Sequence, residues 1–335
     1  MSEEISRRVF LAGVSAFSLL GEARRAAAAE FFTGKTLAIL CGYNPGGGVD
    51  LGTRLIAENI GAYIPGKPKV IVQNMEGAAG IVAANYLYFK APRDGLTLAV
   101  PGRDWLLKPL LGFGSARFDP TKFAYIGSTG ETNVVAYINA KNGIKTVSDL
   151  RNSKKKILFG GLPGATTNTM VPLVLARLGW PVEVIRGYTQ TSFIIHAMEH
   201  GELHAIYTPE SSFARRRDLI DKGEVIQLFQ SGRFMAGLPT IEDIVDPNDR
   251  RLLTLAQGQI PVGMPLVAPP ETPSDTVTIL RAAFRAMTTS HAFETPAKLI
   301  DEPYGAPLFG ENLQLKIADL IASITPSAVQ SYSEL

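Results

Sequence analysis

Short apolar segments alternate with segments of helical periodicity along most of the chain. The apolar segments predict β-strands at 36–43, 69–74, 97–101, 124–127, 134–139, 156–160, 183–186, 205–208, 225–229 and 262–268. Strands that alternate with helices are typical of α/β folds in which most strands of a sheet run parallel. We therefore expect an α/β fold with mainly parallel central sheets.

Two segments carry the apolar stripe of a helix that packs on a core. In the segment after the first predicted strand, the stripe consists of Val49, Ile56, Ile60 and Tyr63. Near the C-terminus, it consists of Val277, Leu280, Phe284 and Met287. A further helical stretch is expected at 81–90.

The first 29 residues have the charged, apolar and small-residue order of an export signal. Arg7 and Arg8 form a pair, an apolar run follows at 9–20, and alanines occupy 26–29. The run of about a dozen apolar residues is shorter than the roughly 20 that span a bilayer. Because the arginine pair resembles a twin-arginine signal, we expect export to the periplasm and removal of residues 1–29.

Composition and charge narrow the function classes. The chain has 335 residues, of which 46% are hydrophobic and 19% charged, and its net charge is +2. This length favours two domains of roughly 150 residues each, and the near-neutral charge argues against a nucleic-acid partner. Cys41 is the one cysteine, so no intramolecular disulfide can form, and its apolar flanks predict a buried position.

No linker separates two consecutive domains along the sequence. We expect the chain instead to cross between two lobes near 135–139 and to return near 230–233. This division places 36–137 plus 233–335 in lobe 1 and 138–232 in lobe 2.

A glycine-rich loop at 43–50 (YNPGGGVD) joins the first predicted strand to the first predicted helix. Consecutive glycines let backbone N–H groups approach a ligand, and the helix N-terminus adds a dipole that favours an anion. The loop has neither a phosphate-loop nor a dinucleotide-binding spacing. The alternative is a tight turn with Asp50 as helix cap, and the sequence leaves open whether Asp50 contacts ligand or only caps the helix.

A second loop of small residues lies at 76–80 (EGAAG), after the next predicted strand and before a helix. Loops that follow successive parallel strands project from the same edge of a sheet, where ligands usually bind in α/β folds. Together, the two loops predict a site for a carboxylate held by several N–H donors.

The ordered motifs resemble a known family. They are 44–50 (NPGGGVD), 74–80 (NMEGAAG) and 94–98 (DGLTL), followed by later echoes at 118–120 (FDP), 238–240 (LPT) and 267–270 (VAPP). This succession is similar to the extracytoplasmic solute receptors of tripartite tricarboxylate transporters, the Bug family. The resemblance covers essentially the whole chain after the export signal.

The resemblance implies a monomeric periplasmic binding protein of type II-like architecture, with two lobes joined by crossover strands. Such a protein closes on a small organic carboxylate and delivers it to a membrane permease, without a cofactor and without catalysis. On the motifs of this chain, and with nearby polar and aromatic candidates added, the expected ligand-binding residues are Tyr43, Pro45, Gly46, Gly47, Gly48, Asp50, Gly77, Ala78, Ala79, Gly80, Arg103, Ala165, Thr166, Thr167, Asn168 and Tyr188.

The second lobe departs from the usual motifs of the family at 164–168 (GATTN) and 186–190 (RGYTQ). These loops are expected to contact the distal end of the ligand, so the identity of the carboxylate stays open. Arg103 can grip a second carboxylate in a bidentate manner, and Trp105 is an aromatic candidate for the same pocket.

Two other function classes remain. A sensory receptor that binds the same carboxylate is one alternative, and a periplasmic enzyme is the other, although no Gly-x-Ser-x-Gly elbow is present. His196, His200 and His204 are spaced for one helix face, but Gly201 interrupts that helix and no metal-binding motif accompanies them. We expect no metal site.

Overall fold

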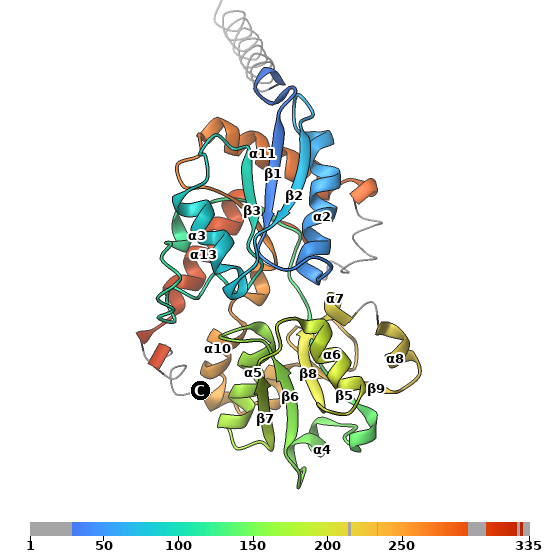
Figure 1. Cartoon of the computed structure of the whole chain (residues 1–335). Coiled ribbons are helices and arrows are strands. Elements are labelled where there is room, and N and C mark those ends of the chain that lie inside the picture. The colour runs from blue at the N-terminus through green and yellow to red at the C-terminus, as the bar shows by residue number, and fades with distance from the viewer. Residues whose placement is uncertain (1–28, 214–215, 233, 294–305, 327–328, 331–335) are drawn as a thin grey trace, which may run out of the picture.

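The computed structural model describes residues 29–213, 216–232, 234–293, 306–326 and 329–330. The predicted export signal falls almost wholly on residues 1–28, outside this described part. Two β-sheets lie one above the other, each in a lobe of its own and flanked by helices (Figure 1).

The first sheet contains six strands in the order β11-β4-β10-β3-β1-β2. Their bounds are β1 Thr36–Cys41, β2 Lys69–Asn74, β3 Thr97–Val100, β4 Ala124–Ser128, β10 Pro265–Ala268 and β11 Leu308–Phe309. β1 pairs in parallel with β2 and β3, whereas β10 runs antiparallel between β3 and β4. β1 to β4 therefore share one direction, and β10 and β11 run the other way.

The second sheet contains five strands in the order β7-β6-β8-β5-β9. Their bounds are β5 Val134–Asn139, β6 Ile157–Gly161, β7 Val182–Arg186, β8 Ala205–Pro209 and β9 Val225–Gln230. β6 is parallel to β7 and β8, while β5 is antiparallel to β8 and β9. Most strands of each sheet thus point the same way, and the predicted α/β class is confirmed.

Helices cover both faces of each sheet. In the first lobe they are α2 Gly48–Ile60, α3 Ile81–Phe89, α11 Ser274–Thr288 and α13 Gly310–Ser323. Between β5 and β9, the chain forms α4 Val147–Arg151, α5 Thr167–Arg177, α6 Thr191–Glu199, α7 Glu210–Phe213 and α8 Arg217–Asp221. Between β9 and β10, it forms α9 Ile241–Ile244 and α10 Arg251–Gln257. No helix within the described ranges is long and apolar enough to cross a membrane.

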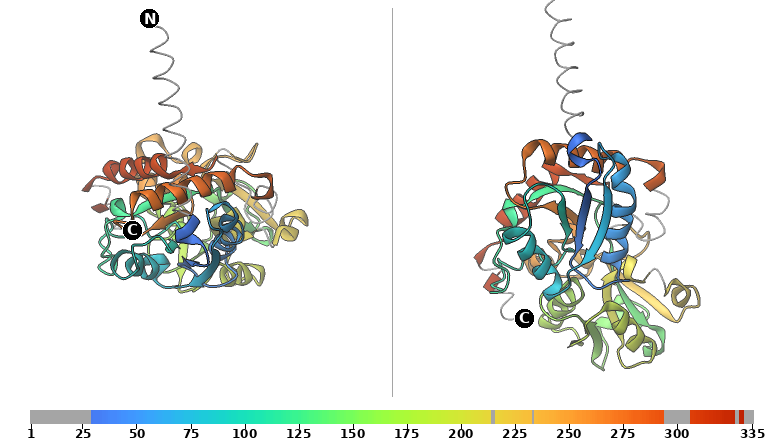
Figure 2. Two further views of the ribbon diagram at one scale, coloured as in Figure 1. Left: turned by 90° about the horizontal axis from the view of Figure 1, so that it is seen from above. Right: turned by 45° about the horizontal axis from the view of Figure 1, so that its top comes forward.

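The two predicted apolar stripes lie in the core on one face of the first sheet. α2 buries Val49, Ile56 and Ile60 and continues into a 3₁₀ turn, Gly61–Tyr63, whose tyrosine is partly buried. α11 buries all four positions of its stripe, Val277, Leu280, Phe284 and Met287. Figure 2 shows from two further directions how these helices, from opposite ends of the chain, both border the first sheet. Cys41 is buried in the same cluster, as its flanks predicted.

A second hydrophobic cluster continues from the other face of the first sheet into the second lobe. On the first-lobe side, Trp105 is fully buried and packs edge to face on Phe123, with 5.2 Å between ring centroids. On the second-lobe side, the cluster includes Phe159 and Val171. The lobes therefore share an apolar contact, and Trp105 belongs to this core and not to the cavity described below.

The chain passes from the first sheet to the second between β4 and β5. After β9 it leaves the second sheet, yet α10 still packs on α5 before β10 joins the first sheet. The predicted division into 36–137 plus 233–335 and 138–232 stays a prediction. Its first boundary falls inside β5, which belongs to the second sheet, and α10 of the predicted lobe 1 packs on α5 of lobe 2.

Candidate functional site

A cavity of about 520 Å³ lies between the two lobes, a size typical of small-molecule sites. Its walls are loops and helix starts that follow the carboxyl ends of β1, β3, β6, β7 and β8. This is the edge at which open α/β sheets bind ligands. Predicted site residues on the lining are Tyr43, Pro45, Gly46, Gly47, Gly48, Arg103, Thr167 and Asn168.

The first glycine loop presents the N-terminus of α2 to the cavity. Gly47 is the N-cap of this helix and no side chain caps it, so the helix start keeps open N–H groups. Gly46 has a φ of +82°, a conformation that favours glycine. Gly48 faces the second lobe, where a Cβ on it would lie 3.3 Å from Oγ of Ser211.

Asp50 braces this loop from behind the cavity. Its Oδ2 accepts the N–H of Gly46 at 2.8 Å and Nε of Arg54 at 2.9 Å, and its Oδ1 accepts Nδ2 of Asn74 at 2.8 Å. Burial opposes the charged carboxylate, but these hydrogen bonds outweigh burial and lower the pKa of Asp50. Asp50 lies outside the cavity lining and is not the helix cap; it orients the loop that forms the lining.

Arg103 is a buried cation on the cavity wall. It is 7% exposed, and its Nη2 donates to Oγ1 of Thr132 at 3.0 Å. Its Nε has no hydrogen-bond partner within the described residues. An unpaired buried guanidinium is costly unless an anion compensates it, so this position favours an anionic ligand.

Asp104 connects the two lobes. Its Oδ2 accepts the hydroxyl of Tyr43 at 2.9 Å, and its Oδ1 accepts both the backbone N–H and the hydroxyl of Thr167, at 2.8 and 2.7 Å. Thr167 is the first residue of α5 in the second lobe. Burial, together with the neighbouring Asp104, raises the pKa of Tyr43 well above its usual value, which keeps this hydroxyl a donor.

The second-lobe loop 164–168 is held by its own hydrogen bonds. Thr166 forms a capping box with Thr169 at the start of α5, and Nδ2 of Asn168 donates to the carbonyl of Tyr207 at 3.0 Å. Ala165 lies behind the lining, and its carbonyl accepts Nζ of Lys108. Burial lowers the pKa of this lysine to about 8.

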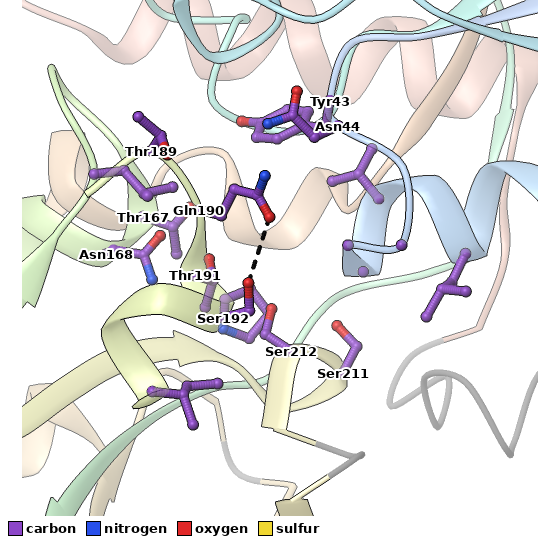
Figure 3. Close-up of a pocket in the computed structure, with 18 of the residues that line it drawn as sticks. Tyr43, Asn44, Thr167, Asn168, Thr189, Gln190, Thr191, Ser192, Ser211 and Ser212 are labelled. Carbon is purple, nitrogen blue, oxygen red and sulfur yellow. Dashed lines mark hydrogen bonds between the residues drawn. The ribbon is translucent and has the colours of Figure 1, made fainter. Parts of the chain in front are cut away.

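The segment before α6, the start of α6 and the helix α7 also line the cavity. Thr189 and Gln190 belong to the loop 186–190, which was expected to contact the distal end of the ligand. Thr191, Ser192, Ser211 and Ser212 are lining residues that the sequence did not single out. Figure 3 shows the Gln190 amide in the space between Tyr43 and Asn44 of the first lobe and Ser192, whose hydroxyl donates to Gln190 at 3.4 Å. Only their position along the chain indicated a role, because they follow β7 and β8 at the same edge of the sheets as the glycine loop.

The second small-residue loop lies outside the cavity lining. Gly77, Ala78, Ala79 and Gly80 all have positive φ values. A Cβ on Gly80 would lie 2.0 Å from the carbonyl oxygen of Pro101, so this glycine permits a close backbone approach. Tyr188 packs partly buried beside the second-lobe core, and Thr166 is buried at the start of α5, both off the lining. Ligand contacts by these residues stay predictions.

The three histidines do not converge. His196 lines the cavity, with its Nε2 3.1 Å from Nε2 of His200, whereas Nδ1 of His204 accepts the N–H of Leu158 elsewhere. Within the described part of the chain, no group of three or more metal-ligating side chains comes together.

Comparisons with known proteins support this architecture. No family model matches the chain. A UPF0065 protein of the gbd 5'region of Cupriavidus necator is 28% identical over 290 residues, covering 83% of this chain and 82% of the relative.

Among solved structures, the periplasmic binding protein BugD superposes with a TM-score of 0.70 at 16% identity, covering 90% of this chain and 97% of BugD. An R. palustris protein with adipate superposes with a TM-score of 0.67 at 18% identity, covering 90% of this chain and 95% of that one. The resemblance seen in the sequence motifs is thereby confirmed in the structural neighbours: the chain has the two-lobed, type II-like fold of the Bug periplasmic binding proteins.

Proposed function

We propose that this protein is a periplasmic solute receptor that captures a small organic carboxylate reversibly between its lobes. The observation that carries the proposal is Arg103, a buried guanidinium with an unpartnered Nε, on the wall of a cavity that also receives the open N-terminus of α2. Backbone N–H groups and a guanidinium are the donors that suit a carboxylate.

The likeness to BugD and to the R. palustris protein with adipate supports a binding role. In the proposed complex, the N–H groups of Gly47 and Gly48 hold one carboxylate from the first lobe together with Arg103, while Gly46 stays hydrogen-bonded to Asp50 and shapes the loop. The second lobe contacts the distal end of the ligand through Asn168 and the start of α6. The lobes move about the crossover segments, as in other two-domain binding proteins.

The receptor reaches the periplasm through its twin-arginine signal and delivers the ligand to a permease of the tripartite tricarboxylate type. It acts without chemical turnover, so the ligand leaves unchanged. Uptake of a bound carboxylate by cells that carry or lack the gene tests the transport role, and mass spectrometry of the released ligand tests the lack of turnover. A binding partner that signals, with unchanged uptake, would favour the sensory alternative.

A thermal-shift screen of the chain without residues 1–29 tests the binding role. Aliphatic, hydroxylated, amino and aromatic carboxylates are compared with neutral sugars and divalent metals. A ligand at 100 times its Kd adds about 2.7 kcal/mol to the free energy of unfolding, which corresponds to a rise in Tm of roughly 5–10 °C. Failure of every carboxylate, together with a response to a neutral sugar or a metal, contradicts the proposal.

A further inference from the structure

The N-terminus of α5 is the place where the second lobe could hold a ligand carboxylate, but a carboxylate of the chain already occupies it. Oδ1 of Asp104 accepts the backbone N–H of Thr167 at 2.8 Å and its hydroxyl at 2.7 Å. Asp104 is 6% exposed and lines the cavity. A second ligand carboxylate at this end would therefore meet a buried like charge, with the donors of Thr167 already engaged.

The charges around the cavity leave one cation for a ligand. On the described lining, Arg216 is paired with Glu199. Lys108 is the cation near Asp104. It is buried and does not line the cavity. Arg103 forms no ion pair with a described residue, and its Nε has no partner. The cavity is thus charge-matched to one carboxylate.

The remaining second-lobe lining combines apolar residues with a set of uncharged polar ones. Leu162, Ile195 and Pro209 are apolar, and His196 lies beside them. The uncharged polar residues are Asn168, Thr189, Gln190, Thr191, Ser192, Ser211 and Ser212. The side chains of Thr189, Thr191, Ser211 and Ser212 form no hydrogen bond with one another or with other described residues. Hydroxyl and amide groups both donate and accept hydrogen bonds, so they suit a neutral ligand end that carries hydroxyl groups.

We propose that the ligand is a monocarboxylate whose remaining part is neutral and hydroxylated, and that Asp104 is a specificity-determining residue that rejects a second carboxylate. This inference rests on the proposed carboxylate-binding function. The proposed ligand differs from adipate, a dicarboxylate, with which one structural neighbour was solved. Arg103 and the glycine loop bind the single carboxylate, and the hydroxyl and amide groups of the second-lobe lining bind the rest.

Matched ligand pairs test the inference on the unaltered mature chain. 6-Hydroxyhexanoate differs from adipate, and gluconate from glucarate, only in whether the distal carbon is an alcohol or a carboxylate. The Kd values are measured by isothermal titration calorimetry at neutral pH. In any pair that binds, we expect the Kd of the monocarboxylate to be roughly tenfold or more below that of the dicarboxylate. Equal or tighter binding of the dicarboxylate overturns the inference and leaves the proposed function intact. Absence of binding by every carboxylate in the wider screen overturns both.

The variant Asp104→Asn tests the role of the charge. It keeps an oxygen acceptor for Thr167 but removes the negative charge, so the preference for the monocarboxylate is expected to fall by roughly fivefold or more. Asp275→Asn removes the same charge from an exposed position in α11 and is expected to leave the preference unchanged. An unchanged preference in Asp104→Asn overturns the assignment, and if that variant does not fold, the matched pairs on the unaltered chain decide.

Discussion

The carboxylate of Asp104 accepts two hydrogen bonds from Thr167, one from its backbone N–H at 2.8 Å and one from its hydroxyl at 2.7 Å. Asp104 follows β3 in the first lobe and Thr167 begins α5 in the second. Because both residues are buried, these charge-assisted bonds are protected from solvent. The two lobes are thus tied by a carboxylate as well as by the chain segments that cross between them.

Replacement of Thr167 tests this tie. Thr167→Val keeps the backbone N–H and the branched shape but removes the hydroxyl donor, so the free energy of unfolding is expected to fall by about 1.5–3 kcal/mol. Thr189→Val is the matched control, because this exposed hydroxyl forms no hydrogen bond with a described residue, and its effect should stay within about 0.5 kcal/mol. Urea unfolding measures both, and equal losses would contradict the role of the Thr167 hydroxyl.

Replacement of Arg103 tests the cation of the cavity. Arg103→Gln removes the guanidinium that we expect to bind the ligand carboxylate, so the Kd for a bound carboxylate should rise roughly 10- to 100-fold. Arg103→Lys keeps the charge and should recover part of the loss. Titration calorimetry provides the measurement, with Arg117→Gln, outside the cavity lining, as control. An unchanged Kd in Arg103→Gln would place the carboxylate elsewhere.

Replacement of Gly47 tests the open helix start. An added Cβ would meet only the Asn44 carbonyl oxygen, at 3.7 Å, so Gly47→Val should fold normally. Its branched side chain should obstruct the N–H groups of α2 and abolish carboxylate binding. Gly114→Val changes an exposed glycine with free space around it and serves as the control for folding and binding. Retained affinity in Gly47→Val would refute the proposed use of this loop.

Gly80 and Gly179 separate packing from backbone strain. Both have φ values in the left-handed region, +91° and +80°, but a Cβ would be 2.0 Å from the Pro101 carbonyl oxygen at Gly80 and would meet nothing within 4 Å at Gly179. Gly179→Ala should therefore cost about 1–2 kcal/mol of unfolding free energy, and Gly80→Ala clearly more. Thermal and urea unfolding compare them, and similar costs would show that the close approach at Gly80 does not matter.

The stability of the protein should depend on pH through Lys108. Burial lowers the pKa of this lysine from 10.5 to about 8 in the folded chain. Between these values the unfolded chain holds a proton that the folded chain has released, so the free energy of unfolding rises with pH across this window. The full rise corresponds to roughly 3 kcal/mol. Urea unfolding of the wild type and of Lys108→Met is measured from pH 7 to 10. The difference between their free energies of unfolding should change with pH. A difference that stays constant would contradict the lowered pKa of Lys108.

Sequence periodicity located β1 to β10 because each combines an apolar run with turn residues at its ends. It missed β11, Leu308–Phe309, since two residues carry no periodic signal. The predicted strand 262–268 begins only at Pro265, because Ile260–Val262 forms a 3₁₀ turn and Gly263 follows with a φ of +65°.

The sequence predicted the part of the cavity lining that a rare glycine-rich motif forms. It predicted less of the part that common side chains form. The triple glycine at 46–48 marks both a strand end and a helix start, and it lies on the lining. The second loop has a similar composition, but Gly80 there accommodates the backbone of Pro101. Small residues in a sequence do not distinguish these two uses. Serines and threonines such as Ser192 and Ser211 are frequent on any surface, so only the fold singled them out.

Gly48 begins α2 in the first lobe. A Cβ atom added to it would lie 3.3 Å from Oγ of Ser211 in the second lobe. The lack of a side chain at this position leaves room for the two lobes to approach each other beside the cavity. An alanine here would require the Ser211 side chain to give by a few tenths of an ångström. A bulkier residue would press on the second lobe, so the glycine that opens the helix start to a ligand also provides the clearance between the lobes.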